Sequence, residues 1–263
     1  MEKKRKKWVF LTALMIVIFF AGGCVSEDAA SETLSRDPVP LEQYREVMEG
    51  IRAYSSVKAR VDTVFLINNG VESLQLNMTT DIRQKGNDIV GLEIEMLTAT
   101  RYLDKSVSMA SYYTDGYFYT DFDGEKIKYR MSDEKMMKEN NLGLIEIEEA
   151  AVRDSRIEYD PEGNYTITIQ ADAGSLKAVL EKYMNQVLEI NPKNLSCMYL
   201  TVVVKCSGDH RILSSDTLVS LQYTEAEAVT EYTIGTYTEY QEINEKLSVD
   251  FPDLTEYREI SAG

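Results

Sequence analysis

Residues 57–82 read VKARVDTVFLINNGVESLQLNMTTDI, and this stretch indicates the class of fold. Apolar or small side chains alternate with polar ones from Val57 to Phe65, and the same period of two returns from Leu74 to Ile82. Asn69-Gly70 lies between the two runs, and this dipeptide is a strong hairpin-turn signal. The stretch therefore predicts two antiparallel strands, each with one face toward a core and one toward solvent.

Similar patterns continue on both sides of this hairpin. Apolar residues at helical spacing predict an amphipathic helix over Leu41 to Tyr54. Further strands are predicted over Val90–Met96, Val107–Tyr113, Tyr117–Phe122 and Ile127–Met131, and they complete a meander of six. One or two helices are then predicted within Ser132–Val152, a strand over Tyr165–Ile169 and a helix over Leu176–Leu188. The last predicted strands are Leu195–Cys206, Arg211–Tyr223, Ala228–Tyr240 with a bulge at Gly235, and a short closing strand over Leu247–Phe251.

About eleven strands and three helical regions make an α+β fold. Each strand has one apolar face, so one face of the sheet is buried, and three helices can cover a sheet of this size only from inside a curve. The sequence therefore predicts a strongly curved antiparallel sheet wrapped over helices that pack on its concave side. The order of helix and meander also occurs twice along the chain, although no repeat is visible at the level of residues.

The N-terminus has the pattern of an export signal. Five basic residues from Lys3 to Lys7 precede the apolar run Trp8–Ala21, and the small residues Ala21, Gly22 and Gly23 precede Cys24. This ending resembles the lipobox of bacterial lipoproteins, in which the cysteine is lipidated and becomes the mature N-terminus, although Ala21 stands where that family usually has Leu. An ordinary secretion signal is an alternative. An uncleaved membrane helix is another, but it would need roughly 20 apolar residues.

This pattern divides the chain into three parts. Residues 1–23 are predicted to be a lipoprotein signal peptide, residues 24–38 a flexible tether without aromatic residues, and residues 39–263 a single domain. The lipid on Cys24 would make the membrane a partner and place the domain on the extracytoplasmic face of the cell membrane. Durable anchoring requires the two or three acyl chains of a lipoprotein cysteine.

The chain is strongly acidic. Its formal net charge is −16, from 28 basic and 44 acidic residues, and removal of residues 1–23 leaves 23 basic and 43 acidic residues, a net charge of about −20. Such a charge repels nucleic acid and anionic headgroups, so neither is expected as a partner. Acidity can simply keep a surface domain soluble, or clustered carboxylates can bind Ca²⁺. The run Asp121–Glu125 is too short for an EF-hand loop and is interpreted as a turn.

The residues that usually carry catalysis are scarce. Cys197 and Cys206 fall in one predicted strand and would lie about 30 Å apart along it, so they are expected to be free thiols, with pairing between molecules as the alternative. The single histidine, His210, follows a Gly208-Asp209 turn and is expected to be solvated. We find no phosphate-binding loop, dinucleotide fingerprint or serine-hydrolase motif. No enzyme activity, cofactor or metal site is therefore predicted.

Three motifs together resemble a family of Gram-positive lipoproteins of unassigned function. They are Leu41-x-x-Tyr44-x-x-Val47-Met48-x-x-Ile51-x-x-Tyr54-Ser55, Tyr113-x-Asp115-Gly116-Tyr117-x-Tyr119, and Val249-Asp250-Phe251-Pro252-Asp253-Leu254-x-x-Tyr257. This family is similar in fold to the LolA/LolB lipoprotein carriers and the mycobacterial LppX/LprG lipid-binding lipoproteins. The resemblance covers residues 39–260, rests on structural motifs rather than catalytic ones, and implies a half-barrel of about eleven strands over an apolar cavity.

The apolar sheet face is rich in Met and Tyr, which suits either an ordinary core or a pocket for acyl chains, because unbranched Met adapts to irregular shapes. Candidate pocket residues are Leu76, Met78, Leu92, Ile94, Met96, Met109, Tyr117, Tyr119, Leu200 and Val202. The preferred hypothesis is a lipoprotein that binds or carries a hydrophobic, lipid-like ligand without catalysis. The alternative is a protein-interaction or sensor module of the cell envelope with a filled core, and a hydrolase built on a carboxylate pair is the third.

Overall fold

The computed structural model of the 263-residue chain describes residues 39–86, 91–103, 105–139, 142, 144–172, 194–225 and 228–260. The predicted signal peptide, Cys24, the tether and the predicted helix Leu176–Leu188 lie outside the described residues. In the part of the chain that is described, no helix has both the length and the hydropathy needed to cross a bilayer.

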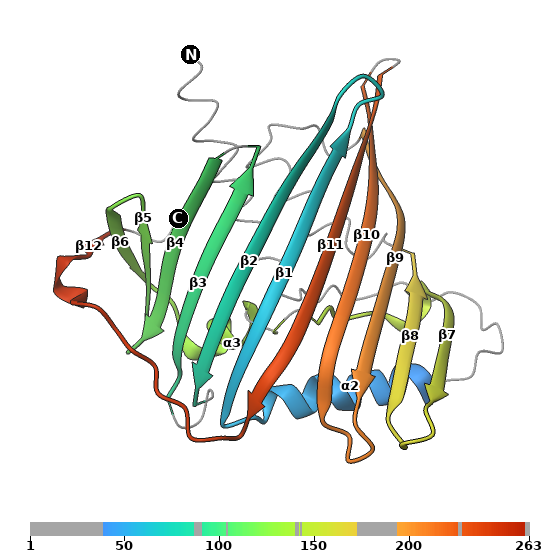
Figure 1. Ribbon diagram of the computed structural model, residues 1–263, viewed down its shortest axis with the longest axis horizontal. Helices are drawn as coiled ribbons and strands as arrows, with labels where there is room; N and C mark the ends of the chain where they lie inside the picture. The colour runs from blue at the N-terminus through green and yellow to red at the C-terminus, as the bar shows by residue number, and fades with distance from the viewer. Residues whose placement is uncertain are drawn as a thin grey trace.

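Within these described ranges, twelve strands form one sheet (Figure 1). The strands are β1 (Ser56–Asn68), β2 (Ser73–Lys85), β3 (Glu93–Tyr102), β4 (Lys105–Thr114), β5 (Tyr117–Phe122), β6 (Glu125–Arg130), β7 (Val152–Tyr159), β8 (Tyr165–Ala171), β9 (Leu195–Cys206), β10 (Ile212–Glu225), β11 (Ala228–Ile243) and β12 (Arg258–Glu259). Their order across the sheet is β12-β6-β5-β4-β3-β2-β1-β11-β10-β9-β8-β7. Neighbours are antiparallel except β12 and β6, which are parallel.

The sheet consists of two meanders, β1–β6 and β7–β11, which meet where β1 pairs with β11. The strand order does not close on itself, and β7 and β12 are its two edge strands. The curved antiparallel α+β sheet predicted from the alternating pattern, with its six-stranded first meander, and the half-barrel implied by the family resemblance are therefore confirmed. Two predicted strands, Tyr117–Phe122 and Leu195–Cys206, have the observed bounds of β5 and β9.

The two α-helices of the described residues lie on the same side of the sheet, near one end of the long strands (Figure 1). Helix α2 (Val39–Arg52) buries the apolar stripe that predicted it: Leu41, Tyr44, Val47, Met48 and Ile51. Helix α3 spans Asp133–Glu139, and the short 3₁₀ turns η1 (Glu149–Ala151) and η3 (Leu254–Glu256) complete the described helical elements.

The prediction of helices throughout Ser132–Val152 was wrong in its second half. Residues 144–148 are neither helix nor strand, and Leu144, Ile145 and Ile147 are buried. Their apolar side chains pack in the core as an irregular segment, so an apolar pattern was mistaken for a helix. The following strand β7 was not predicted, because this edge strand is mostly exposed and carries charged residues.

Two details of the C-terminal third were also predicted wrongly. Gly235 pairs in regular register with Val64 and Leu218, whereas the register shift lies between Lys58 and Ala59, where Gln241 is the extra residue on β11. The closing strand over Leu247–Phe251 does not form, and the chain instead reaches the far edge of the sheet, where β12 pairs with β6.

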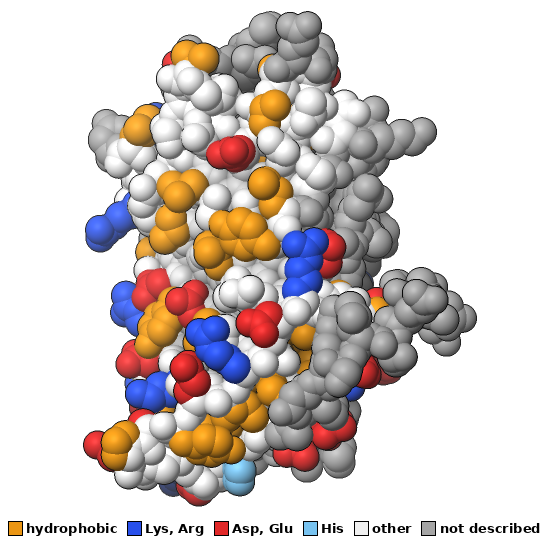
Figure 2. All heavy atoms as spheres, turned by 90° about the vertical axis from the view of Figure 1, so that its right-hand side faces the viewer, with side chains coloured by type: hydrophobic (Ala, Val, Ile, Leu, Met, Phe, Trp, Pro, Cys, Tyr) orange, Lys and Arg blue, Asp and Glu red, His pale blue; other side chains and the backbone are white. Residues whose placement is uncertain are grey.

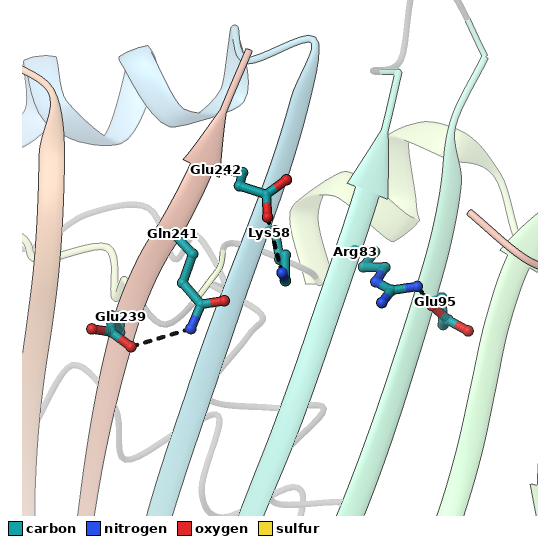
Figure 3. Close-up of polar contacts among 6 residues, drawn as sticks. All are labelled: Lys58, Arg83, Glu95, Glu239, Gln241 and Glu242. Atoms are coloured by element: carbon teal, nitrogen blue, oxygen red, sulfur yellow. Dashed lines mark hydrogen bonds and ion pairs between the residues drawn. The ribbon is translucent and has the colours of Figure 1, made fainter. Parts of the chain in front are cut away.

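One large core cluster includes residues of α2, α3, the 144–147 segment and both meanders. This identifies the concave face as the face that carries Val57, Leu76, Ile94, Leu200 and Ile234. On the opposite, convex face, ion pairs join neighbouring strands (Figure 3). The Nζ of Lys58 lies 2.9 Å from Oε1 of Glu242, and Nη1 of Arg83 lies 3.3 Å from Oε2 of Glu95. The polar half of the alternating pattern therefore faces outward.

Candidate functional site

The concave face contains eight of the ten predicted pocket residues. Leu76, Met78, Leu92, Ile94, Leu200 and Val202 belong to the large core cluster, and Met96 packs against it. Met109 is buried on the same face, because it pairs with Thr98, which lies on the face that Leu76 and Met78 share. Residues from β2, β3, β4 and β9 are thus brought onto one continuous surface.

Tyr117 and Tyr119 lie on the other face. They form a second cluster with Tyr112, Phe251, Leu254 and Tyr257, where the C-terminal segment packs against the convex side of β4 and β5. The ring of Tyr119 meets that of Tyr257 edge to face, with centroids 5.3 Å apart. Lys128 lies over the rings of both Tyr117 and Tyr119. These two tyrosines hold the C-terminal segment and do not share a surface with the other eight residues.

The end of the concave face near α2 is closely packed. The Tyr44 hydroxyl donates to the carbonyl of Ile145 at 2.6 Å and accepts from the Ile145 amide at 3.1 Å, and the Tyr240 hydroxyl donates to the carbonyl of Leu142 at 2.5 Å. Burial raises the pKa of both tyrosines, so each remains a neutral donor.

A void of about 10 Å³ lies in this region, lined by Met48, Ile51, Arg52, Gln84, Met137, Leu142 and Leu144. This volume is at the lower limit for a single water molecule. Helix α2, Leu142 and the 144–147 segment therefore fill this end of the half-barrel.

Further along the strands, the concave face carries a band of buried hydroxyl groups, which we call the hydroxyl belt. Its nine members lie on six neighbouring strands, β4, β3, β2, β1, β11 and β10. They are Ser111, Thr98, Thr100, Thr80, Thr63, Thr236, Thr238, Ser215 and Thr217. Sequence reasoning missed this belt, because Thr suits any strand and the alignment becomes visible only when the register of non-consecutive strands is known.

Two cross-strand rows make up most of the belt. One row pairs Thr98, Thr80, Val61, Thr238 and Ser215, and the next pairs Thr100, Met78, Thr63, Thr236 and Thr217. The belt spans five strands here, a width of about 19 Å at 4.8 Å per strand. Apolar rows flank it, with Ile82 and Ala59 on the α2 side and Leu76, Phe65 and Ile234 on the other. The concave face is therefore apolar, then polar, then apolar along the strands.

Some of these hydroxyls pair with one another and others have no partner. The Oγ1 atoms of Thr80 and Thr98 are 3.0 Å apart, and those of Thr63 and Thr236 are 3.4 Å apart. The Oγ of Ser215 lies 3.5 Å from the Tyr240 hydroxyl oxygen. The hydroxyl oxygens of Ser111, Thr217 and Thr238 are buried without a hydrogen-bond partner, and these residues are 1%, 1% and 0% exposed. Each unpaired buried hydroxyl costs about 1–3 kcal/mol.

A groove of about 590 Å³ lies at the end of the sheet near the C-terminus of α2. Its lining mixes turn backbone with charged side chains of both signs: Ser55, Lys85, Gly86, Gly91, Leu92, Glu93, Thr114, Asp115, Gly116 and Asp133. Leu92 is the one predicted pocket residue among them. The mixed charges distinguish this groove from the apolar concave face.

The cysteine thiols and the histidine are the next groups to place. Burial raises the pKa of the Cys206 thiol to about 11, so the thiol is protonated at neutral pH. His210 is exposed in its turn, and its Nδ1 lies 3.0 Å from the Tyr165 hydroxyl. Among the described residues, no group of three His, Cys, Asp or Glu side chains is placed to hold a metal ion. The side chain of Cys197 lies outside the described part of the chain.

Some large hydrophobic side chains are exposed among the charged residues of the outer surface. Tyr199, Leu218 and Tyr237, on β9, β10 and β11, are 42%, 36% and 45% exposed and lie on the convex face. Viewed from the β7 side, Figure 2 shows hydrophobic patches among mixed acidic and basic residues.

Comparison with known proteins gave matches to solved structures only. No family model matches the sequence, and no curated protein matches it. LprF from Mycobacterium bovis is 10% identical, with a TM-score of 0.43, over 83% of this chain and 99% of LprF. A LolA superfamily protein from Nitrosomonas europaea is 8% identical, with a TM-score of 0.27, over 80% of this chain and 94% of its own. A DUF1329 family protein from Desulfovibrio piger is 11% identical, with a TM-score of 0.26, over 81% of this chain and 95% of its own.

These similarities concern the fold alone. The half-barrel architecture itself follows from the strand order of this chain. What the concave face binds must be argued from its own residues.

Proposed function

We propose that this chain is a membrane-anchored extracytoplasmic lipoprotein that binds or carries a hydrophobic, lipid-like ligand without catalysis. The supporting observation is the concave face. An unclosed sheet brings apolar side chains from ten strands onto one curved, buried surface, and the described helices lie near one end of its strands (Figure 1). Burying apolar ligand surface there would contribute about 25 cal/mol per Å², so an acyl chain supplies its own driving force.

The anchor is part of the proposal. Residues 1–23 would be removed after Ala21-Gly22-Gly23, Cys24 would carry the lipid, residues 24–38 would act as the tether, and residues 39–263 would form the single ligand-binding domain. Replacing Cys24 with Ser should move the protein from the membrane fraction to the soluble extracytoplasmic fraction and remove the acyl mass from its N-terminal peptide. A Cys24→Ser protein that stays with the membrane would contradict lipid anchoring.

Ligand binding is tested by extraction. The mature chain is purified after gentle lysis, extracted with organic solvent, and the extract is analysed by mass spectrometry, which separates a bound amphiphile from the covalent lipid on Cys24. We expect close to one amphiphile per protein. A clean blank from a cooperatively folded sample would refute the proposal.

The exposed patch of Tyr199, Leu218 and Tyr237 favours a second candidate, a protein-interaction module of the cell envelope. A blank extraction together with a partner that co-purifies with the wild type and is lost from a Tyr199→Ser/Tyr237→Ser variant would support this candidate. The hydrophobic-ligand proposal predicts the reverse, with ligand retained in the same variant, because these side chains lie on the convex face.

A further inference from the structure

Strand β7 forms one edge of the sheet (Figure 1). The opposite edge is covered by the C-terminal residues of the same chain, because β12 pairs with β6 and the Ile260 amide donates to the Lys128 carbonyl at 2.9 Å. Among the described residues, β7 pairs with β8 alone. The described chain therefore caps one edge of its sheet and leaves the other edge without a neighbouring strand.

The register of the β7–β8 hairpin shows which backbone groups of β7 point outward. The Asp160 amide donates to the Asn164 carbonyl at 2.9 Å, so these two residues form a hydrogen-bonded pair. Such pairs alternate along antiparallel strands, so the backbone groups of Arg156 and Glu158 face β8. The outward N–H and C=O groups belong to the residues that alternate with them, Ser155, Ile157 and Tyr159. Within the described part of the chain, no hydrogen bond reaches these outward groups.

The side chains of β7 limit which strand can pair with this edge. On the convex face, Arg156 and Glu158 are exposed and opposite in charge, with Nε and Oε2 3.3 Å apart. On the concave face, Ile157 packs partly against the core, and Tyr159 is 68% exposed beside the Tyr165 ring. Like charges directly opposite each other are unfavourable in a sheet, so a suitable strand presents the same alternation of charge in the reverse direction.

We infer that β7 pairs antiparallel with β7 of a second copy of this chain, with the two Ile157 residues facing each other at the two-fold axis. Arg156 of each copy then lies opposite Glu158 of the other, which gives two ion pairs on the convex face. Ser155 lies opposite Tyr159, so the hydrogen-bonded pairs are those whose backbone groups point outward. The pairing needs neither the lipid anchor nor a ligand, so the inference is independent of the proposed function.

Charge distinguishes this register from its neighbours. With the axis at residue 156, Arg156 would face Arg156 and Asp154 would face Glu158, and both combinations are repulsive. With the axis at residue 155, the pairing would extend over the irregularity at the start of β7. In the inferred register, Asp154 faces Asp160 only beyond the end of the strand, where the Asp160 carboxylate accepts from amides of its own turn.

Sedimentation velocity tests the inference on the mature chain with Cys24→Ser, which needs no detergent. Five paired residues on each strand bury little area, so we expect a weak dimer with a Kd on the order of 100 µM, visible as a shift from monomer toward dimer between about 5 and 500 µM. Arg156→Glu alone, or Glu158→Arg alone, should raise the Kd by about tenfold, because each change makes both charge pairs repulsive.

A mixture of the two variants is the sharpest measurement. In an equimolar mixture, the acidic pair of one variant faces the basic pair of the other, so a heterodimer should form with about the wild-type Kd although each variant dimerises poorly alone. The matched control is Arg258→Glu on β12, at the opposite edge of the sheet. It changes the net charge by the same amount as Arg156→Glu and should leave the Kd unchanged.

Each outcome supports or overturns the inference. A wild type that stays monomeric over the whole range overturns it. Charge reversals without effect, or an equal effect from Arg258→Glu, overturn β7 as the interface, and so does a mixture that remains monomeric. Melting temperatures within about 3 °C of the wild type confirm that the variants fold, as expected for exposed side chains. A blank lipid extraction contradicts the proposed function alone and leaves the dimer standing.

Discussion

At the scale of single residues, Tyr44 holds the 144–147 segment against α2. Its hydroxyl both donates to and accepts from the backbone of Ile145. Tyr44→Phe keeps the ring but leaves a buried N–H and C=O unpaired, so we expect a loss of about 1–3 kcal/mol in the free energy of unfolding, measured with urea. Tyr237→Phe, at an exposed position, should change stability by less than about 0.5 kcal/mol. Equal effects of the two changes would show that the Ile145 contacts contribute nothing.

Glu95 makes stability depend on pH. Burial raises its pKa above the ordinary value of 4.5, Arg83 at 3.3 Å opposes this rise, and Asp250 adds to it. The folded state therefore holds the proton more tightly than the unfolded state. The resulting stabilisation is full below pH 4.5 and is lost as the pH rises through the higher folded pKa.

Replacing Glu95 with Gln removes this titration. We expect the stability of the wild type relative to Glu95→Gln to fall between pH 4 and pH 7, as measured by urea unfolding at both values. A relative stability of the wild type that rises over the same range would show that the pair with Arg83 outweighs burial.

At the scale of elements, the C-terminal segment is held on the convex face by Tyr257. This residue packs against Tyr119, and the Lys126 ammonium lies 5.7 Å from the centre of its ring and pairs with Glu256. Tyr257→Ala should cost roughly 2–4 kcal/mol, because a buried ring is lost.

The Tyr257 hydroxyl provides the matched control, because it is buried without a partner. Tyr257→Phe should therefore be neutral or slightly stabilising in the same urea titration. A large loss from Tyr257→Phe would mean that the hydroxyl, not the ring, holds the segment.

Some strand bounds could be predicted from sequence patterns alone, and others could not. Strand β5 lies between two Asp-Gly turns, and β9 is a long uninterrupted β-rich run, so the bounds of both could be predicted. Strand β7 was missed because its edge position lets it carry Arg153, Asp154 and Arg156, which disguise a strand. Residues 144–147 were misassigned because a run of buried apolar residues does not reveal whether its backbone is helical.

The candidate site was predictable only in part. Alternation groups Leu76 with Met78, and Ile94 with Met96, but it does not reveal which face curves inward. Around Tyr117 and Tyr119 both faces are covered, since the C-terminal segment lies over the convex side, so apolar character was misleading there. The hydroxyl belt depends on pairing β1 with β11, which are far apart in the sequence.

At the scale of the whole molecule, we expect the two meanders to unfold together. One core cluster includes residues of both, and Phe65 on β1 stacks on Tyr232 of β11 across the seam, with ring centroids 6.1 Å apart. Circular dichroism and tyrosine fluorescence should therefore report one coincident urea transition.

Phe65→Ala tests this coupling. It should lower the free energy of unfolding by about 3–5 kcal/mol without splitting the transition. Two separate transitions in the wild type or in this variant would mean that the meanders are independent domains.

The pairing of β1 with β11 also determines when the sheet can be completed during biosynthesis. One edge of β1 receives β2 soon after it is made, but its other edge waits for Ala228–Ile243, some 160 residues later. At 5–20 residues per second, ribosomal synthesis takes roughly 8–30 s to cover that interval. During this time the newborn chain carries an unpaired strand edge at what will become the centre of its sheet, and it must be kept from aggregating until nearly the last residue has been made.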